Sequence, residues 1–132
     1  MPQSYIKRIL NARVYDVARE TPLEQAPLLS RRIGNEAWLK REDLQPVFSF
    51  KCRGAFNKLI NLSDKARGKG VVAASAGNHA QGVALGAQKL GVKATIVMPL
   101  TTPAIKVDAV RSRGATVILF GDTFDEAATK AR

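Results

Sequence analysis

The chain contains one cysteine, Cys52, among 132 residues, and it lacks any long apolar run. A single cysteine cannot form an intrachain disulfide, so we expect a protein of a reducing compartment, the cytoplasm. No apolar stretch approaches the roughly 20 residues that span a membrane. The first residues also lack the apolar core of a secretory signal. The sequence therefore predicts neither a disulfide scaffold nor a membrane protein.

Acidic residues are scarce: 21 Lys and Arg face 11 Asp and Glu, and the formal net charge is +10. A net positive charge of this size is typical of proteins that bind nucleic acids. The basic residues form no long block, however, and no aromatic residues are interleaved with them to stack on bases. We therefore expect no nucleic-acid binding. An anionic small-molecule partner explains the positive charge equally well. Truncation of a longer chain explains it too, because a fragment need not have the same balance of charges as the whole.

Histidine is scarcer still, and His79 has no Cys or Asp partner at the spacing of metal ligands. We expect no metal site. The sequence also lacks a P-loop and the Gly-x-Gly-x-x-Gly pattern, so neither of these phosphate-binding motifs is expected.

The spacing of apolar residues predicts an α/β protein. In the first part it predicts a helix over residues 6–19, a second over 26–33 and a short strand over 37–40, followed by a polar loop over 42–46. Helices and strands then alternate, with strands over 71–74, 94–98 and 116–120. Helices are expected over 55–62 and 80–90, after Thr102-Pro103, and after a capping box at Thr123–Glu126. This alternation predicts a parallel sheet with flanking helices.

The chain ends inside the last expected helix, so we expect an incomplete domain. Residues 1–48 or so would form a lead-in that packs on a large subdomain. Residues 49–132 or so would form part of a small α/β subdomain.

The run Ser75–His79 lies where an expected strand ends and a helix begins. Small residues at this edge of a parallel sheet let the backbone approach a ligand, and the helix N-terminus favours an anion. The alternative is a plain turn that uses Gly77 for its geometry.

A second run, Ser49–Ala55, places Lys51 at the entrance to an expected helix, with Phe50 and Cys52 beside it and Arg53 two residues on. Such surroundings are compatible with an amine that acts as a nucleophile. From this run alone, the simpler interpretation is that Lys51 is an ordinary solvated lysine.

Together the two runs resemble a known family. Ser-Phe-Lys-x-Arg-Gly-Ala followed by Ser-x-Gly-Asn-His-x-x-Gly is similar to the fold-type II pyridoxal-phosphate enzymes. The runs Thr21–Leu23 and Lys40–Pro46 look like the threonine dehydratase pattern, and the run that begins at Lys40 is most similar to the biosynthetic type. The resemblance covers nearly the whole chain.

The resemblance implies roles for particular residues. Lys51 would attach to pyridoxal 5'-phosphate and act as the catalytic base. Phe50 would pack against the ring of the cofactor, and Asn78 would bind its 3-hydroxyl group. The substrate carboxylate would be held on the backbone of Ser75, Gly77, Asn78 and His79. Ala76 stands where serine racemases carry a hydroxyl, and this favours elimination over racemisation.

The implied activity is the dehydration and deamination of L-threonine to 2-oxobutanoate and ammonia, the first step of isoleucine biosynthesis. The full-length enzyme is expected to be a homo-oligomer, a tetramer in relatives. Its phosphate-binding loop and regulatory part are expected beyond residue 132, so we expect little activity from these residues alone. The alternatives are a serine or catabolic threonine dehydratase, and a non-catalytic binding module or truncated product.

Overall fold

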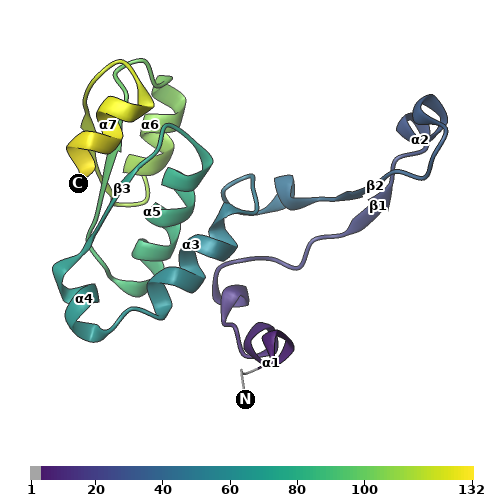
Figure 1. Ribbon diagram of the computed structural model, residues 1–132, viewed down its shortest axis with the longest axis horizontal. Helices are drawn as coiled ribbons and strands as arrows, with labels where there is room; N and C mark the ends of the chain where they lie inside the picture. The colour runs from purple at the N-terminus through teal and green to yellow at the C-terminus, as the bar shows by residue number, and fades with distance from the viewer. Residues whose placement is uncertain (1–3) are drawn as a thin grey trace.

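Two separate sheets organise the chain, whose residues 4–132 are described in a computed structural model (Figure 1). The helices are α1 (Tyr5–Leu10), α2 (Pro27–Ile33), α3 (Lys51–Ile60), α4 (Asp64–Lys69), α5 (Asn78–Leu90), α6 (Ala104–Arg111) and α7 (Phe124–Ala131), with short 3-10 turns η1 (Val14–Asp16) and η2 (Glu42–Leu44). The strands are β1 (Leu23–Gln25), β2 (Trp38–Lys40), β3 (Val71–Ala74), β4 (Ala94–Met98) and β5 (Thr116–Leu119).

The larger sheet is parallel, in the order β3-β4-β5. Ala73 pairs with Ile96 in its first ladder, and Val97 pairs with Ile118 in its second. The connections run through α5 and α6, which pack against each other. The parallel α/β sheet with flanking helices predicted from the sequence is thus confirmed.

The main core lies between this sheet and the helices α3, α5 and α6. Side chains alternate along β4, so Ile96 and Met98 point into that core and are fully buried. Val97 points to the other face, where α7 packs against β3 and β4. Each of these fully buried side chains contributes about 2–3 kcal/mol through the area it removes from water.

The smaller sheet is an antiparallel ribbon that extends away from the α/β unit, with α2 at its far end (Figure 1). Gly34 ends α2 in the left-handed conformation, at φ 65°. The ribbon and α2 leave large apolar side chains exposed: Leu23, Leu28, Leu29, Ile33, Trp38 and Leu39.

Several expected elements differ in the structure. The helix expected over residues 6–19 is wrong, because α1 ends at Leu10 and only η1 follows. Ile6, Ile9 and Leu10 are exposed, so they lack the packing that would hold a longer helix. Both β1 and α4 went unpredicted. Thr102 precedes the N-cap of α6, which is Pro103, and does not cap it.

Over residues 4–132, no helix is both long and apolar enough to cross a membrane. The same part of the chain holds no group of three His, Cys, Asp or Glu side chains that could bind a metal ion.

Candidate active site

The two sequence runs meet where the first turn of α3 lies against α5. A Cβ built on Gly82 would stand 2.8 Å from the carbonyl oxygen of Lys51, so the backbones touch with no side chain between them. Asn78 precedes Gly82 by four residues and therefore lies on the same face of α5. One helical turn is about 5.4 Å long. The sequence thus brings Lys51 and Asn78 to neighbouring positions across one helix contact.

Lys51 is the first residue of α3 and its side chain is exposed. Its Nζ lies 5.0 Å from the centre of the Phe50 ring. Within residues 4–132, no carboxylate forms an ion pair with this amine. Lys51 therefore presents an amine that stands beside an aromatic face and is available to a carbonyl group.

A strained turn at Phe48 immediately precedes α3 and Lys51. Phe48 has φ 56°, a left-handed conformation that non-glycine residues rarely adopt and that costs on the order of 1–3 kcal/mol. The flanking side chains of Val47 and Ser49 are buried, whereas Phe48 and Phe50 are exposed. Burial of Val47 and Ser49 holds this turn in place and leaves both phenyl rings on the outside, with that of Phe50 beside the lysine.

The turn before α5 is shaped by Ser75, whose Oγ accepts hydrogen bonds from the backbone N–H groups of Gly77 and Ala80, at 3.2 Å each. Asn78 and His79 begin α5 with exposed side chains. The N-terminus of this 13-residue helix carries a partial positive charge. The structure therefore offers a turn of small residues with an anion-favouring field.

Lys106, in the first turn of α6, adds a full positive charge at this turn. Its Nζ lies 3.7 Å from the position that a Cβ of Gly77 would occupy. No carboxylate pairs with Lys106 in the part of the chain that the structure describes. Sequence reasoning missed this residue, since 29 positions separate it from Gly77 and nothing in the local pattern links them.

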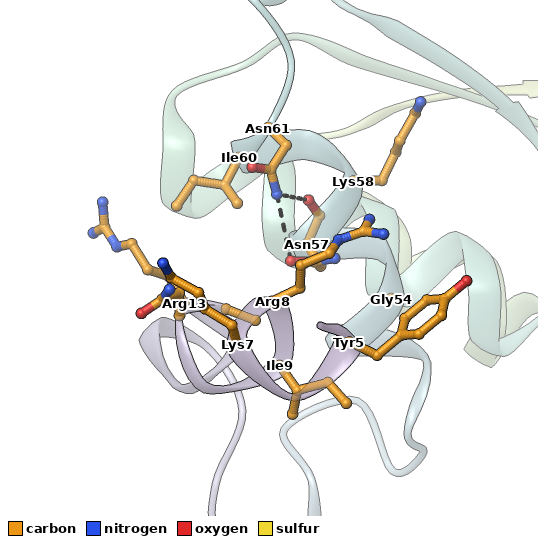
Figure 2. Close-up of a pocket in the computed structure, with 12 residues that line it drawn as sticks. Tyr5, Lys7, Arg8, Ile9, Arg13, Gly54, Asn57, Lys58, Ile60 and Asn61 are labelled. Atoms are coloured by element: carbon orange, nitrogen blue, oxygen red, sulfur yellow. Dashed lines mark hydrogen bonds between the residues drawn. The ribbon is translucent and has the colours of Figure 1, made fainter. Parts of the chain in front are cut away.

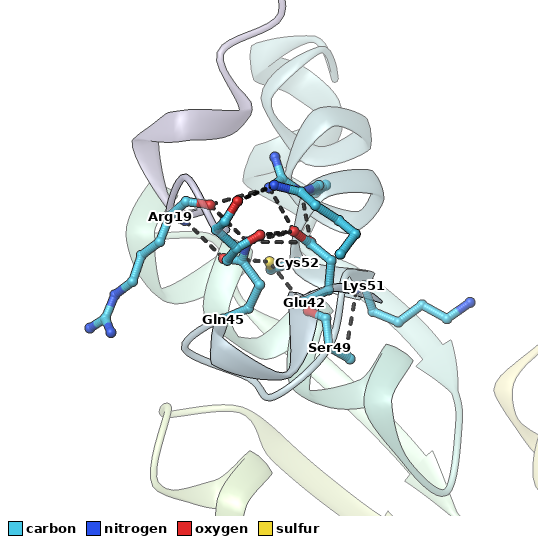
Figure 3. Close-up of polar contacts among 9 residues, drawn as sticks. Arg19, Glu42, Gln45, Ser49, Lys51 and Cys52 are labelled. Carbon is cyan, nitrogen blue, oxygen red and sulfur yellow. Dashed lines mark hydrogen bonds and ion pairs between the residues drawn. The ribbon is translucent and has the colours of Figure 1, made fainter. Parts of the chain in front are cut away.

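A polar cluster also went unrecognised in the sequence, where residues 42–46 were expected to form a loop (Figure 3). The carboxylate of Glu42 accepts hydrogen bonds from Arg53 Nε at 2.8 Å, from the second Arg53 nitrogen at 3.0 Å and from the Thr21 hydroxyl at 2.6 Å. Chiefly because of the bonds from Arg53, the pKa of Glu42 is lowered to about 2. Glu42 therefore remains ionised at neutral pH, and its charge is paired.

A cavity with a volume near 820 Å³ lies elsewhere, between α1 and α3 (Figure 2). Cations and amides line it, among them Arg8, Lys58 and Asn57, but neither Lys51 nor any residue of the Ser75–His79 turn does. Lys51, Asn78 and His79 are themselves exposed, so the site that the sequence predicts lies at the surface, where α3, α5 and the start of α6 meet.

These residues fit a small, flat, aldehyde-bearing cofactor. Lys51 supplies the amine, Phe50 an aromatic face beside it and Asn78 an amide one turn along α5. Gly82 removes the side chain that would otherwise part the two helices. The roles that the sequence resemblance implies for Lys51, Phe50, Asn78 and the Ser75–His79 turn stay predictions.

Comparison with known proteins identifies what the chain is similar to. Residues 14–132 match the family described as pyridoxal-phosphate dependent enzyme. Threonine dehydratase 1 biosynthetic, chloroplastic, from Solanum lycopersicum is 60% identical over 128 residues, which cover 97% of this chain and 21% of that protein. The chain thus spans about a fifth of the length of this curated relative.

Solved structures of enzymes with related names resemble this chain in fold as well as in sequence. The processed form of threonine deaminase isoform 2 from Solanum lycopersicum superposes with a TM-score of 0.89 at 60% identity, over 96% of this chain and 35% of that one. Maize serine racemase superposes with a TM-score of 0.86 at 34% identity, over 94% of this chain and 38% of the racemase.

Proposed function

Since the chain belongs to the family of pyridoxal-phosphate dependent enzymes, we propose that it contributes the cofactor lysine to a biosynthetic threonine dehydratase. The reaction converts L-threonine to 2-oxobutanoate and ammonia, and it opens isoleucine biosynthesis. The contact between Lys51 and Gly82 carries the proposal, because it brings the backbone of the first turn of α3, where Lys51 lies, against the helix that follows the Ser75–His79 turn. The 60% identity to a biosynthetic dehydratase supports the choice of substrate.

Lys51 has two tasks in this proposal. It would hold pyridoxal phosphate through its amine, and the same Nζ would take the α-proton of the substrate as general base. When bound, the cofactor supplies an electron sink for the electron pair left at the α-carbon. Phe50 would cover one side of the ring and exclude water there, and Asn78 would hydrogen-bond its hydroxyl group.

The substrate carboxylate would lie at the start of α5. Backbone N–H groups of Gly77, Asn78 and His79 would orient it, while Ser75 keeps the turn in shape through its own two hydrogen bonds. Lys106 would add an attractive charge a few ångströms away. A carboxylate fixed in this way would restrict the orientation of the substrate, as proton transfer from its α-carbon to Lys51 requires.

The rest of the catalytic unit would come from outside these residues. The chain covers 35% of the solved threonine deaminase, and the exposed apolar side chains of the ribbon suit burial against further protein. We propose that residues 1–48 or so pack on a large subdomain in this way. The homo-oligomeric state and the cytoplasmic location stay predictions.

The test is reductive trapping. The purified chain is incubated with pyridoxal phosphate and reduced with borohydride, and the modified lysines are mapped by mass spectrometry. We expect selective labelling of Lys51 over Lys58, which lies on the same helix and is also exposed. Labelling of the two lysines in proportion to their exposure would contradict a cofactor site in this chain.

A further inference from the structure

We propose that Glu42 and Arg53 form a positioning pair, which fixes the first turn of α3 so that Lys51 faces the site. The proposal deepens the proposed function and rests on it for the role of Lys51. It also explains why the Lys40–Pro46 run and the Ser49–Ala55 run occur together: Glu42 of the first run binds Arg53 of the second.

The pair has the geometry of a specific contact. Arg53 approaches Glu42 with two nitrogens, at 2.8 and 3.0 Å, in the two-pronged arrangement that guanidinium and carboxylate groups favour. Both side chains are largely covered, with 24% of Arg53 and 15% of Glu42 exposed. The guanidinium also lies over the Tyr15 ring, 5.2 Å from its centre. A pair so enclosed loses less of its attraction to solvent than an open surface pair.

Gln45 anchors the pair to the lead-in segment. Its amide exchanges two hydrogen bonds with the backbone of Arg19, each 2.8 Å long, and its nitrogen also donates to the carboxylate of Glu42. The hydroxyl of Thr21 donates to that carboxylate as well. Thr21 and Gln45 lie outside α3, whereas Arg53 lies in it. The carboxylate of Glu42 therefore connects α3 to the segment that precedes it (Figure 3).

Consecutive residues of the first turn are therefore held in different directions. Lys51 rests its carbonyl against Gly82, Cys52 is fully buried beside Gln45, and Arg53 is bound by Glu42. Successive residues of a helix point about 100° apart, so these contacts leave the turn little freedom to rotate. The direction in which the Lys51 side chain leaves the helix follows from this, although that side chain forms no hydrogen bond with either member of the pair.

The experiment compares Glu42→Gln with Asp43→Asn in the full 132-residue chain. Each change replaces a carboxylate by an amide of the same shape, but Asp43 pairs with Arg41 on an exposed surface and not with α3. The readout is the ratio of borohydride-trapped pyridoxal phosphate at Lys51 to that at Lys58. Global loss of structure affects both lysines, whereas a misdirected Lys51 lowers the ratio alone.

We expect Glu42→Gln to lower this ratio about fivefold, the factor that a partly covered ion pair contributes. Arg53→Gln should do the same, and the double variant should do no more than either single change, because all three remove one interaction. Asp43→Asn should leave the ratio unchanged. Equal ratios in wild type and Glu42→Gln, with Lys51 labelled selectively in both, would overturn the proposal.

Hydrogen exchange separates this proposal from the proposed function. The amide of Arg53 donates to the carbonyl of Phe50 and reports on the first turn directly. Its exchange should accelerate about fivefold in Glu42→Gln relative to amides in the middle of α5, with or without cofactor. If wild-type Lys51 is not labelled selectively, the proposed function fails for this chain, and the exchange rate of Arg53 still decides whether Glu42 fixes the turn. An unchanged rate would refute the positioning pair.

Discussion

Gly82 on α5 and Lys51 on α3 touch through their backbones. A Cβ on Gly82 would come within 2.8 Å of the Lys51 oxygen and 2.9 Å of its carbonyl carbon, closer than real Cβ atoms approach. The atoms in the way are backbone, which cannot rotate aside. The missing side chain of Gly82 therefore allows the backbone of Lys51 to pack directly against α5.

Gly82→Ala should destabilise the fold, and Gly54→Ala should not. Overpacking of this kind costs about 1–3 kcal/mol, because α3 and α5 must move apart. At Gly54, which also lies inside a helix, a Cβ would meet nothing within 4 Å, so alanine should stabilise the chain by up to about 1 kcal/mol. Urea unfolding followed by circular dichroism measures both. Similar unfolding midpoints for the two variants would mean that the helices tolerate separation.

The fold should lose stability as acid protonates Glu42. Its pKa is about 2 in the folded chain and near 4.5 without its partners, so its contribution is present above pH 4.5 and disappears as the pH falls toward 2. The contribution is on the order of 1–2 kcal/mol, since solvent reaches the rim of the pair.

The measurement is the thermal midpoint at several pH values between 6 and 2. Glu42→Gln should be less stable than wild type at pH 6 and should approach it at pH 2, because the amide has no proton to gain in this range. Asp43→Asn serves as the control for a general loss of negative charge. A constant difference between wild type and Glu42→Gln at every pH would show that the charge of Glu42 does not stabilise the fold.

Local patterns were sufficient to predict most of the α/β unit. The strands β3 and β4 lie where runs of small and branched apolar residues predicted them, and Gly91 ends α5 in the left-handed conformation. The capping box at Thr123 is also present, with Glu126 bonded back to the backbone of Thr123. In each case the signal lies within a few residues of the element that it specifies.

Features that depend on distant partners escaped prediction. The strand β1 has three residues and exists through its pairing with β2, across the intervening α2. Glu42 belongs to the polar segment interrupted by Pro46 that was expected to form a loop, and its coverage depends on Arg53, eleven positions later. The motifs located Lys51 and the Ser75–His79 turn, but the neighbours that hold them are set by the packing of α3, α5 and α6.

Lys106→Ala should weaken the binding of a small carboxylate at the turn before α5. Two opposite charges about 4 Å apart attract by about 1 kcal/mol in water, which corresponds to roughly fivefold in affinity. Acetate, titrated while the amide signals of Gly77 and Asn78 are followed by NMR, reports on this turn directly. Lys106→Arg should retain binding, since the charge remains. Lys89→Ala, which removes an exposed lysine from the last turn of α5, should also retain it. If Lys106→Ala and Lys89→Ala bind acetate equally, then the backbone and the dipole of α5 attract the anion without help from α6.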